Sequence, residues 1–192
     1  MGSDILLVTG IHRDELEFGD RVAALIDPTS VDVLRIPEGI SRARLGAERE
    51  FYLGARHREI YLQLQQQVRG RYRLLIDLHS GLDENGPCAD IFCHDASVLS
   101  CLAGRLPLGG DPDRVRLIEI LGRGERLAQG AGDGGAVAAG ARTWIPRAIW
   151  ASNAPVYVGL EVFLKEDGEG DREDWQLALG VIGILVSCVS AV

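Results

Sequence analysis

The chain has few cysteines and no apolar segment long enough to span a membrane. Its four Cys, in 192 residues, follow no familiar disulfide spacing, so we expect reduced thiols and a cytoplasmic location. The first residues lack the charged, apolar and small-residue order of a signal peptide. The apolar stretch at 177–192 is shorter than the roughly 20 residues that cross a bilayer, and the charged run 171–174 is typical of a helix start. We therefore predict a buried helix there and no membrane partner.

The chain also has fewer basic than acidic residues. The chain has 20 Lys and Arg against 28 Asp and Glu, a net charge of −8. This balance argues against a nucleic-acid partner, because the phosphates would be repelled. The Gly-rich run 130–135 is not followed by the Lys-Ser/Thr pair of a phosphate-binding loop, so we interpret 121–142 as a mobile surface loop or lid.

Three of the cysteines lie near one another in the sequence and raise the question of a structural metal. The group is Cys88, Cys93, His94 and Cys101. The segment 88–93 alternates like a strand, and the odd spacing of Cys88 and Cys93 points their side chains to opposite faces. We therefore favour buried thiols over a structural zinc site.

Apolar, β-branched runs alternate with helix-like stretches along the chain. The runs are at 4–9, 31–36, 73–79, 88–93, 115–120 and 156–163, and helix-like stretches occupy 14–26 and 48–68. We find no internal repeat and expect a single domain over 1–192. The alternation predicts an α/β three-layer sandwich with a mostly parallel mixed sheet, whose ligands would lie beyond the carboxyl ends of the strands.

Two histidines and two glutamates lie where three of these runs end. His12 and Glu15 follow the first run, His79 closes the third, and Glu161 ends the last. Two imidazoles and one carboxylate leave a fourth tetrahedral position open, as a catalytic zinc requires. We therefore predict one Zn²⁺ per chain, bound by His12, Glu15 and His79, with Glu161 as the group that handles protons.

Each of these residues also has a purely structural interpretation. His12 and His79 could be hydrogen-bonded core histidines, and Glu15 could be a first-turn acid favoured by the helix dipole. Glu161 is harder to explain in this way, because a carboxylate in an apolar strand is costly unless it is paired or functional. Asp77 shares a strand face with His79, and could accept that ring's spare N–H or cap the neighbouring loop.

The ordered motifs resemble those of the succinylglutamate desuccinylase/aspartoacylase family, a branch of the zinc carboxypeptidase superfamily. The family's Gly-x-His-Gly-x-Glu segment resembles 10–15, its Asp-Leu-His segment resembles 77–79, and its Pro-Val-Gly-Ile-Glu-Val element resembles 158–162. The resemblance covers nearly the entire chain. It implies a zinc carboxypeptidase-like fold, with the metal bound by His12, Glu15 and His79, and Glu161 as general base and acid.

The arginines depart in part from the family pattern. Arg49 matches the family's carboxylate-binding Arg, but Glu48 replaces the Asn that precedes it. Arg44 lies where the family places an Arg near the oxyanion, although a solvated basic face would explain it equally well. Trp144, Arg147, Trp150 and Tyr157 precede Glu161 and either line the pocket, with Arg147 contacting substrate, or form core and surface aromatics.

The length is a second departure. The chain ends soon after Glu161 and has no room for the family's C-terminal β domain, so either the pocket is open or a second subunit of a homo-oligomer closes it. We predict a zinc-dependent amidohydrolase that deacylates a small anionic N-acyl amino acid. The alternatives are a metallo-carboxypeptidase acting on peptides and a non-catalytic homologue that binds metal or ligand.

Overall fold

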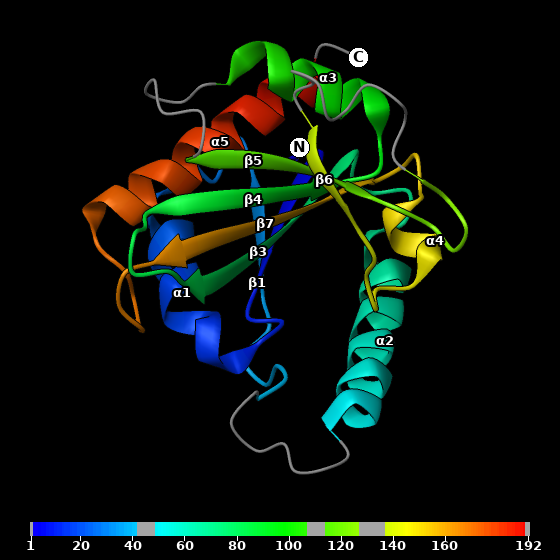
Figure 1. The fold of residues 1–192 in the computed structure, drawn as a ribbon, viewed down its shortest axis with the longest axis horizontal. Helices are drawn as coiled ribbons and strands as arrows, with labels where there is room; N and C mark the ends of the chain where they lie inside the picture. The colour runs from blue at the N-terminus through cyan, green and yellow to red at the C-terminus, as the bar shows by residue number, and fades with distance from the viewer. Residues whose placement is uncertain (1, 42–48, 107–113, 127–136, 191–192) are drawn as a thin grey trace.

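A seven-stranded mixed sheet crosses the protein in the order β2-β1-β3-β7-β4-β5-β6 (Figure 1). The computed structural model describes residues 2–41, 49–106, 114–126 and 137–190. Neighbouring strands are parallel except β4 and β7, which are antiparallel. The predicted mostly parallel mixed sheet is therefore confirmed. The strands are β1 (Ile5–Thr9), β2 (Asp32–Arg35), β3 (Leu74–Leu82), β4 (Cys88–Cys93), β5 (Val115–Ile120), β6 (Val137–Ala141) and β7 (Val156–Leu164).

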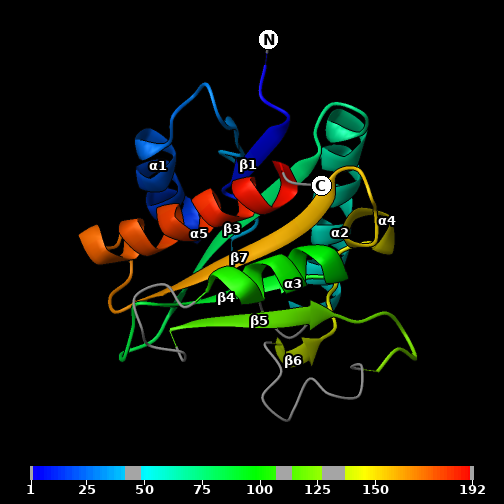
Figure 2. The same cartoon turned by 90° about the horizontal axis from the view of Figure 1, so that it is seen from above.

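Helices cover both faces of the sheet, which gives three layers (Figures 1 and 2). One side carries α1 (Leu16–Leu25), α3 (Ala96–Arg105) and α5 (Arg172–Ser190). The other carries α2 (Arg49–Val68) and the short α4 (Arg147–Trp150). A 3-10 turn, η1 (Arg13–Glu15), leads into α1.

Strand alternation divides the buried side chains into two cores. On β3, Leu74, Ile76 and Leu78 point into the core under α1 and α5, while Leu75 faces α2 together with Tyr61. Asp77 and His79 follow Leu75 at two-residue steps and therefore lie on the α2 face. The candidate site is consequently built on the side of the sheet that α2 covers.

The region 121–142, predicted to be a loop, contains an edge strand. β6 pairs with β5 from Val137 to Ala141 through a register shift next to Leu117. Its sequence, Val-Ala-Ala-Gly-Ala, is poor in β-branched residues, so the strand forms through pairing with β5 rather than from local preference. The Gly-rich run 130–135 lies outside the described residues.

The cysteines correct a second expectation. Cys101 on α3 and Cys188 on α5 form a disulfide, so these two are not reduced thiols. The spacing of the cysteines in the sequence does not indicate this disulfide, because the disulfide depends on the packing of α3 against α5. The two cysteines are 87 residues apart in the sequence. Cys88 and Cys93 are free thiols, and Cys93 is buried as predicted. Burial raises the pKa of the Cys93 thiol to about 12.

The apolar C-terminal stretch forms α5, as expected, and packs against the sheet. Val181 and Leu185 are fully buried in the core that α5 shares with β7. Within the described ranges, no helix combines the length and apolarity needed to cross a bilayer.

Candidate metal centre

The first two site residues are placed by the turn after β1. Gly10 has φ +81°, and a Cβ there would stand 2.4 Å from the Ile36 carbonyl oxygen, so this sharp turn requires glycine. His12 forms an isolated bridge with Ile40, which fixes the backbone that follows. The η1 turn then brings Glu15 to the same side as His12.

The third residue comes from the neighbouring strand, although not from its end. His79 was predicted to close its strand, and Glu161 to end another. The structure corrects both, because β3 and β7 stay paired as far as Leu82 and Leu164. Each residue thus lies inside a strand, and His79 is directly opposite Glu161 in the register. Both strands lie in the middle of the sheet, with a paired neighbour on each side.

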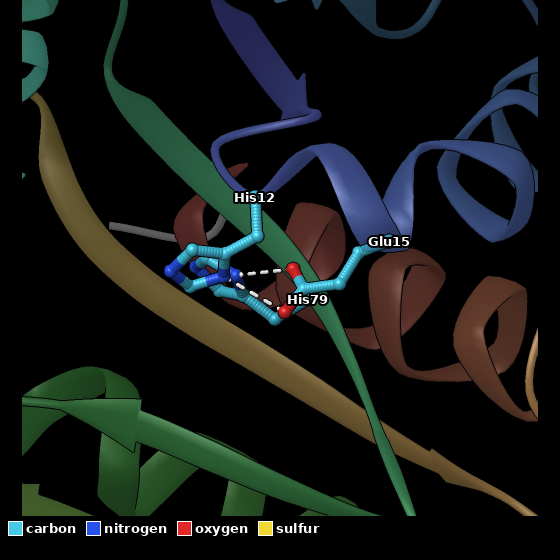
Figure 3. A group of neighbouring side chains, drawn as sticks. All are labelled: His12, Glu15 and His79. Carbon is cyan, nitrogen blue, oxygen red and sulfur yellow. Dashed lines mark hydrogen bonds and ion pairs between the residues drawn. The ribbon is translucent and has the colours of Figure 1, made fainter. Parts of the chain in front are cut away.

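His12, Glu15 and His79 converge on one point (Figure 3). The Glu15 carboxylate lies between the two rings, with Oε1 2.8 Å from His12 Nδ1 and Oε2 2.8 Å from His79 Nδ1. One potential ligand atom from each residue lies within 4.8 Å of the others. Glu15 is only 4% exposed and His12 only 8%. The three residues predicted as ligands are therefore brought together by the fold.

The contacts within this cluster shift the pKa values of Glu15 and His79. Burial opposes the charge on Glu15, but hydrogen bonds from His12 and His79, with their positive charge, lower the pKa of Glu15 to about 2. Burial likewise opposes the charge on His79, yet Asp77 and Glu15 raise the pKa of its imidazole well above the ordinary value. The Glu15 carboxylate is thus held between the two imidazoles.

Asp77 holds the far side of the His79 ring. Its Oδ2 is 3.1 Å from His79 Nε2 and also accepts hydrogen bonds from the hydroxyl groups of Tyr61 and Tyr157. Asp77 is fully buried, and despite that burial the charge on His79 lowers the pKa of the Asp77 carboxyl. Of the two interpretations of Asp77, the contact with the ring is the one observed. The contact leaves Nδ1 of His79 facing Glu15.

His57, which no sequence motif indicates, contacts the imidazole of His12. His57 lies on α2, and its Nε2 is 2.8 Å from His12 Nε2, with the two rings edge to face. Nothing in the local sequence marks it, because it stands alone among polar helix residues, and its role follows only from how α2 packs on the sheet. Each histidine of the cluster thus has a partner for its outer ring nitrogen.

Glu161 lies beside the cluster in a cavity of about 210 Å³. His12, His57 and His79 line the same cavity. Glu161 Oε1 lies 3.1 Å from the point where a Cβ on Gly81 would stand, so glycine at that position leaves room for the carboxylate. The predicted proton-handling group therefore opens onto the space next to the three candidate ligands.

None of the three arginines predicted for the site is placed at the cavity by the described residues. Arg44 and Glu48 lie outside the described residues, and Arg49 begins α2 with its side chain undescribed. Arg147 is exposed, with Nη2 3.3 Å from Glu125 Oε1, and does not line the cavity. Arg142, which we did not single out, does line it.

Two of the four aromatic and basic residues expected at the pocket line the cavity. Trp144 and Tyr157 are among its lining residues. Trp150 instead packs in the core between the sheet and α2, with its indole N–H bonded to the Ile145 carbonyl oxygen. The core interpretation therefore holds for Trp150.

The donor set fits a zinc ion. Two imidazole Nδ1 atoms and a carboxylate oxygen face a common point, and each ring's opposite nitrogen is hydrogen-bonded to a fixed partner. Within the described parts of the chain, this is the one group of three or more His, Cys, Asp or Glu side chains close enough to bind a metal together. Cys88, Cys93 and His94 are not brought into such a group.

Comparisons with known proteins give similarities in structure only. No family model and no curated protein matches the chain. The structure is similar to murine aminoacylase 3, at 13% identity and a TM-score of 0.42, covering 97% of this chain and 63% of that one. It is also similar to succinylglutamate desuccinylase from Vibrio parahaemolyticus, at 12% identity and a TM-score of 0.44, covering 100% and 67%. The chain thus spans less than two-thirds of the aminoacylase.

Proposed function

We propose that the protein is a zinc-dependent hydrolase that cleaves the amide bond of a small N-acyl amino acid. The observation that carries the proposal is the convergence of His12, Glu15 and His79 next to a cavity that also contains Glu161. A bound zinc ion would supply Lewis-acid polarisation of the amide carbonyl and would lower the pKa of water towards about 7. The motif resemblance to the desuccinylase/aspartoacylase family supports the same reaction.

Glu161 is the residue that moves the proton. Its carboxylate takes a proton from the attacking water as the water oxygen bonds to the amide carbon. It then returns that proton to the nitrogen as the carbon–nitrogen bond breaks, so a carboxylate and an amine leave. Such acid–base transfer contributes about 10²–10⁴-fold to the rate. We further propose that Arg44 stabilises the oxyanion and that Arg49 contacts the substrate. Arg147 lies outside the cavity and is paired with Glu125, so the substrate contact expected for it is not proposed.

The first test is metal content. Protein purified without chelating resin is expected to contain about one zinc per chain by elemental analysis, and His12→Ala and His79→Ala are expected to lose it. Arg21→Ala, which removes an exposed ion pair with Glu169 and a contact with the Trp175 ring, is the matched control and should retain zinc. Protein that stays metal-free after zinc is added back would show that the cluster is structural.

The reaction is tested with zinc-loaded protein on two sets of substrates. N-acyl amino acids should be hydrolysed, with the free amine detected, while dipeptides and tripeptides test the carboxypeptidase alternative. Faster cleavage of peptides than of every N-acyl amino acid would replace the deacylase proposal with that alternative. No turnover of either set by protein that contains zinc would favour a binding homologue.

His57 provides a further prediction about the metal site. When a metal occupies Nδ1 of His12, Nε2 of that ring carries hydrogen and donates to His57, which fixes the ring's orientation. His57→Leu removes the acceptor and is expected to weaken zinc binding by about 10–100-fold. His57→Gln, which offers an amide oxygen, should recover part of that loss.

The control for His57 is Arg58→Leu, one residue further along α2 and exposed. Zinc affinity is measured by competition with a chromophoric chelator, and helix content by circular dichroism. Equal zinc affinity in His57→Leu and the parent protein would remove His57 from the site. A loss shared by Arg58→Leu would assign the effect to α2 rather than to the ring contact.

A further inference from the structure

The cavity beside the cluster has an apolar floor. On β7, Gly159 lies two residues before Glu161 on the same strand face, and Phe92 of β4 lies opposite Gly159 in the register. Further across the sheet, Ile120 of β5 lies opposite Ala141 of β6. All four of these residues line the cavity. The floor next to the scissile position is therefore built of hydrocarbon and a bare glycine.

The segment after β6 forms the other wall. Arg142, Trp144 and Ile145 line the cavity there. Trp144 is 68% exposed, and its ring lies 3.5 Å from where a Cβ on Gly54 of α2 would stand. The indole thus reaches towards α2 near the cavity mouth and has a large apolar surface that a bound molecule can cover.

Charge is unevenly distributed around this space. Among described lining residues, Arg142 is the one arginine or lysine, and it is exposed at the wall. Glu161 contributes a carboxylate on the cluster side. A single substrate carboxylate can reach Arg142, but a second one against Phe92 and Ile120 would lose its hydration without gaining a cationic partner among the described lining residues.

We propose that the site selects N-acyl amino acids with one carboxylate and one apolar substituent beside the scissile amide, in preference to N-acyl derivatives of aspartate or glutamate. The inference rests on the proposed function, because that function places the scissile amide at the His12, Glu15 and His79 cluster. The apolar substituent lies on the floor formed by Gly159, Phe92 and Ile120 and under Trp144. The substrate's carboxylate pairs with Arg142 at the mouth.

Binding is measured so that the outcome does not depend on turnover. Zinc-loaded Glu161→Gln protein is titrated by calorimetry with N-acetyl-leucine, N-hexanoylglycine and N-acetyl-aspartate. Either or both of the first two should bind at least about 10-fold more tightly than N-acetyl-aspartate, because one well-placed methylene is worth roughly 10–200-fold. The first two ligands also distinguish an apolar side chain from an apolar acyl group.

Two substitutions at the exposed Trp144 test the wall without disturbing the core. Trp144→Ala should lower the affinity for the apolar ligand by about 10-fold, because the indole no longer covers that ligand. Trp144→Arg should lower the affinity for the apolar ligand and raise the affinity for N-acetyl-aspartate. Leu25→Ala is the control, since Leu25 is 56% exposed on α1, on the opposite side of the sheet, and should change neither affinity.

Equal or tighter binding of N-acetyl-aspartate by the Glu161→Gln protein would overturn the inference, as would failure of all three ligands to bind at millimolar concentration. An unchanged apolar affinity in Trp144→Ala would also overturn it. A failure of the proposed function gives a different result. The parent protein, which keeps Glu161, would then bind zinc and the apolar ligand but would not hydrolyse that ligand.

Discussion

Replacement of Glu161 by glutamine is expected to lower kcat by about 10²–10⁴-fold while zinc stays bound. Glutamine keeps the shape of the side chain but cannot accept the water's proton. Because Glu161 stands on β7 opposite His79 and is not one of the three convergent ligands, metal content should not fall. Steady-state kinetics and elemental analysis on the same sample check both parts.

The matched control is Glu166→Gln, an exposed glutamate just beyond the end of β7. It should retain both activity and zinc. Activity of Glu161→Gln within about threefold of the parent would exclude the proton-transfer role, since such a loss corresponds to less than about 1 kcal/mol of transition-state stabilisation. Loss of zinc would instead place Glu161 among the ligands.

Replacement of Asp77 by alanine is expected to lower the free energy of unfolding by about 3–5 kcal/mol. Three buried donors, the hydroxyls of Tyr61 and Tyr157 and the ring of His79, share one oxygen of this carboxylate. Removal of the carboxylate takes this shared acceptor away from all three donors in the interior. Urea denaturation of metal-free protein, followed by tryptophan fluorescence, measures the loss.

Two controls separate this network from a general effect of losing a carboxylate. Asp20→Ala breaks the surface ion pair with Arg35 and should cost no more than about 1 kcal/mol. Tyr157→Phe removes one donor and leaves the carboxylate paired with Tyr61 and His79, so a loss of about 1 kcal/mol is expected. A cost for Asp77→Ala similar to that of Asp20→Ala would contradict the network.

The sequence predicted those parts of the fold whose signal is local. Six of the seven strands coincide with apolar, β-branched runs, and α2 and α5 were anticipated from composition and start signals. The three converging side chains were also identified, because each follows or belongs to such a run. Strand β6 was missed, since Val137–Ala141 has little strand preference and is held by its neighbour β5.

The features that the sequence did not reveal depend on tertiary packing. His57 meets His12 only because α2 lies across the site face of the sheet, 45 residues along the chain. Cys101 and Cys188 meet only because α3 packs beside α5. The exact placement of His79 and Glu161 within their strands, and Arg142 in place of Arg147 at the cavity, likewise follow from pairing between distant segments.

The order in which the strands are synthesised differs from their order in the sheet. β7, the last strand along the described chain, lies between β3 and β4 and divides the sheet into an N-terminal half, β2-β1-β3, and a half made of β4, β5 and β6. A chain emerging from the ribosome therefore presents two sheet edges that stay open until β7 arrives. Pairings so distant in sequence favour slow folding. The three candidate metal ligands belong to the early half, whereas Glu161 arrives with the closing strand, so the three side chains can come together before the cavity beside them is complete.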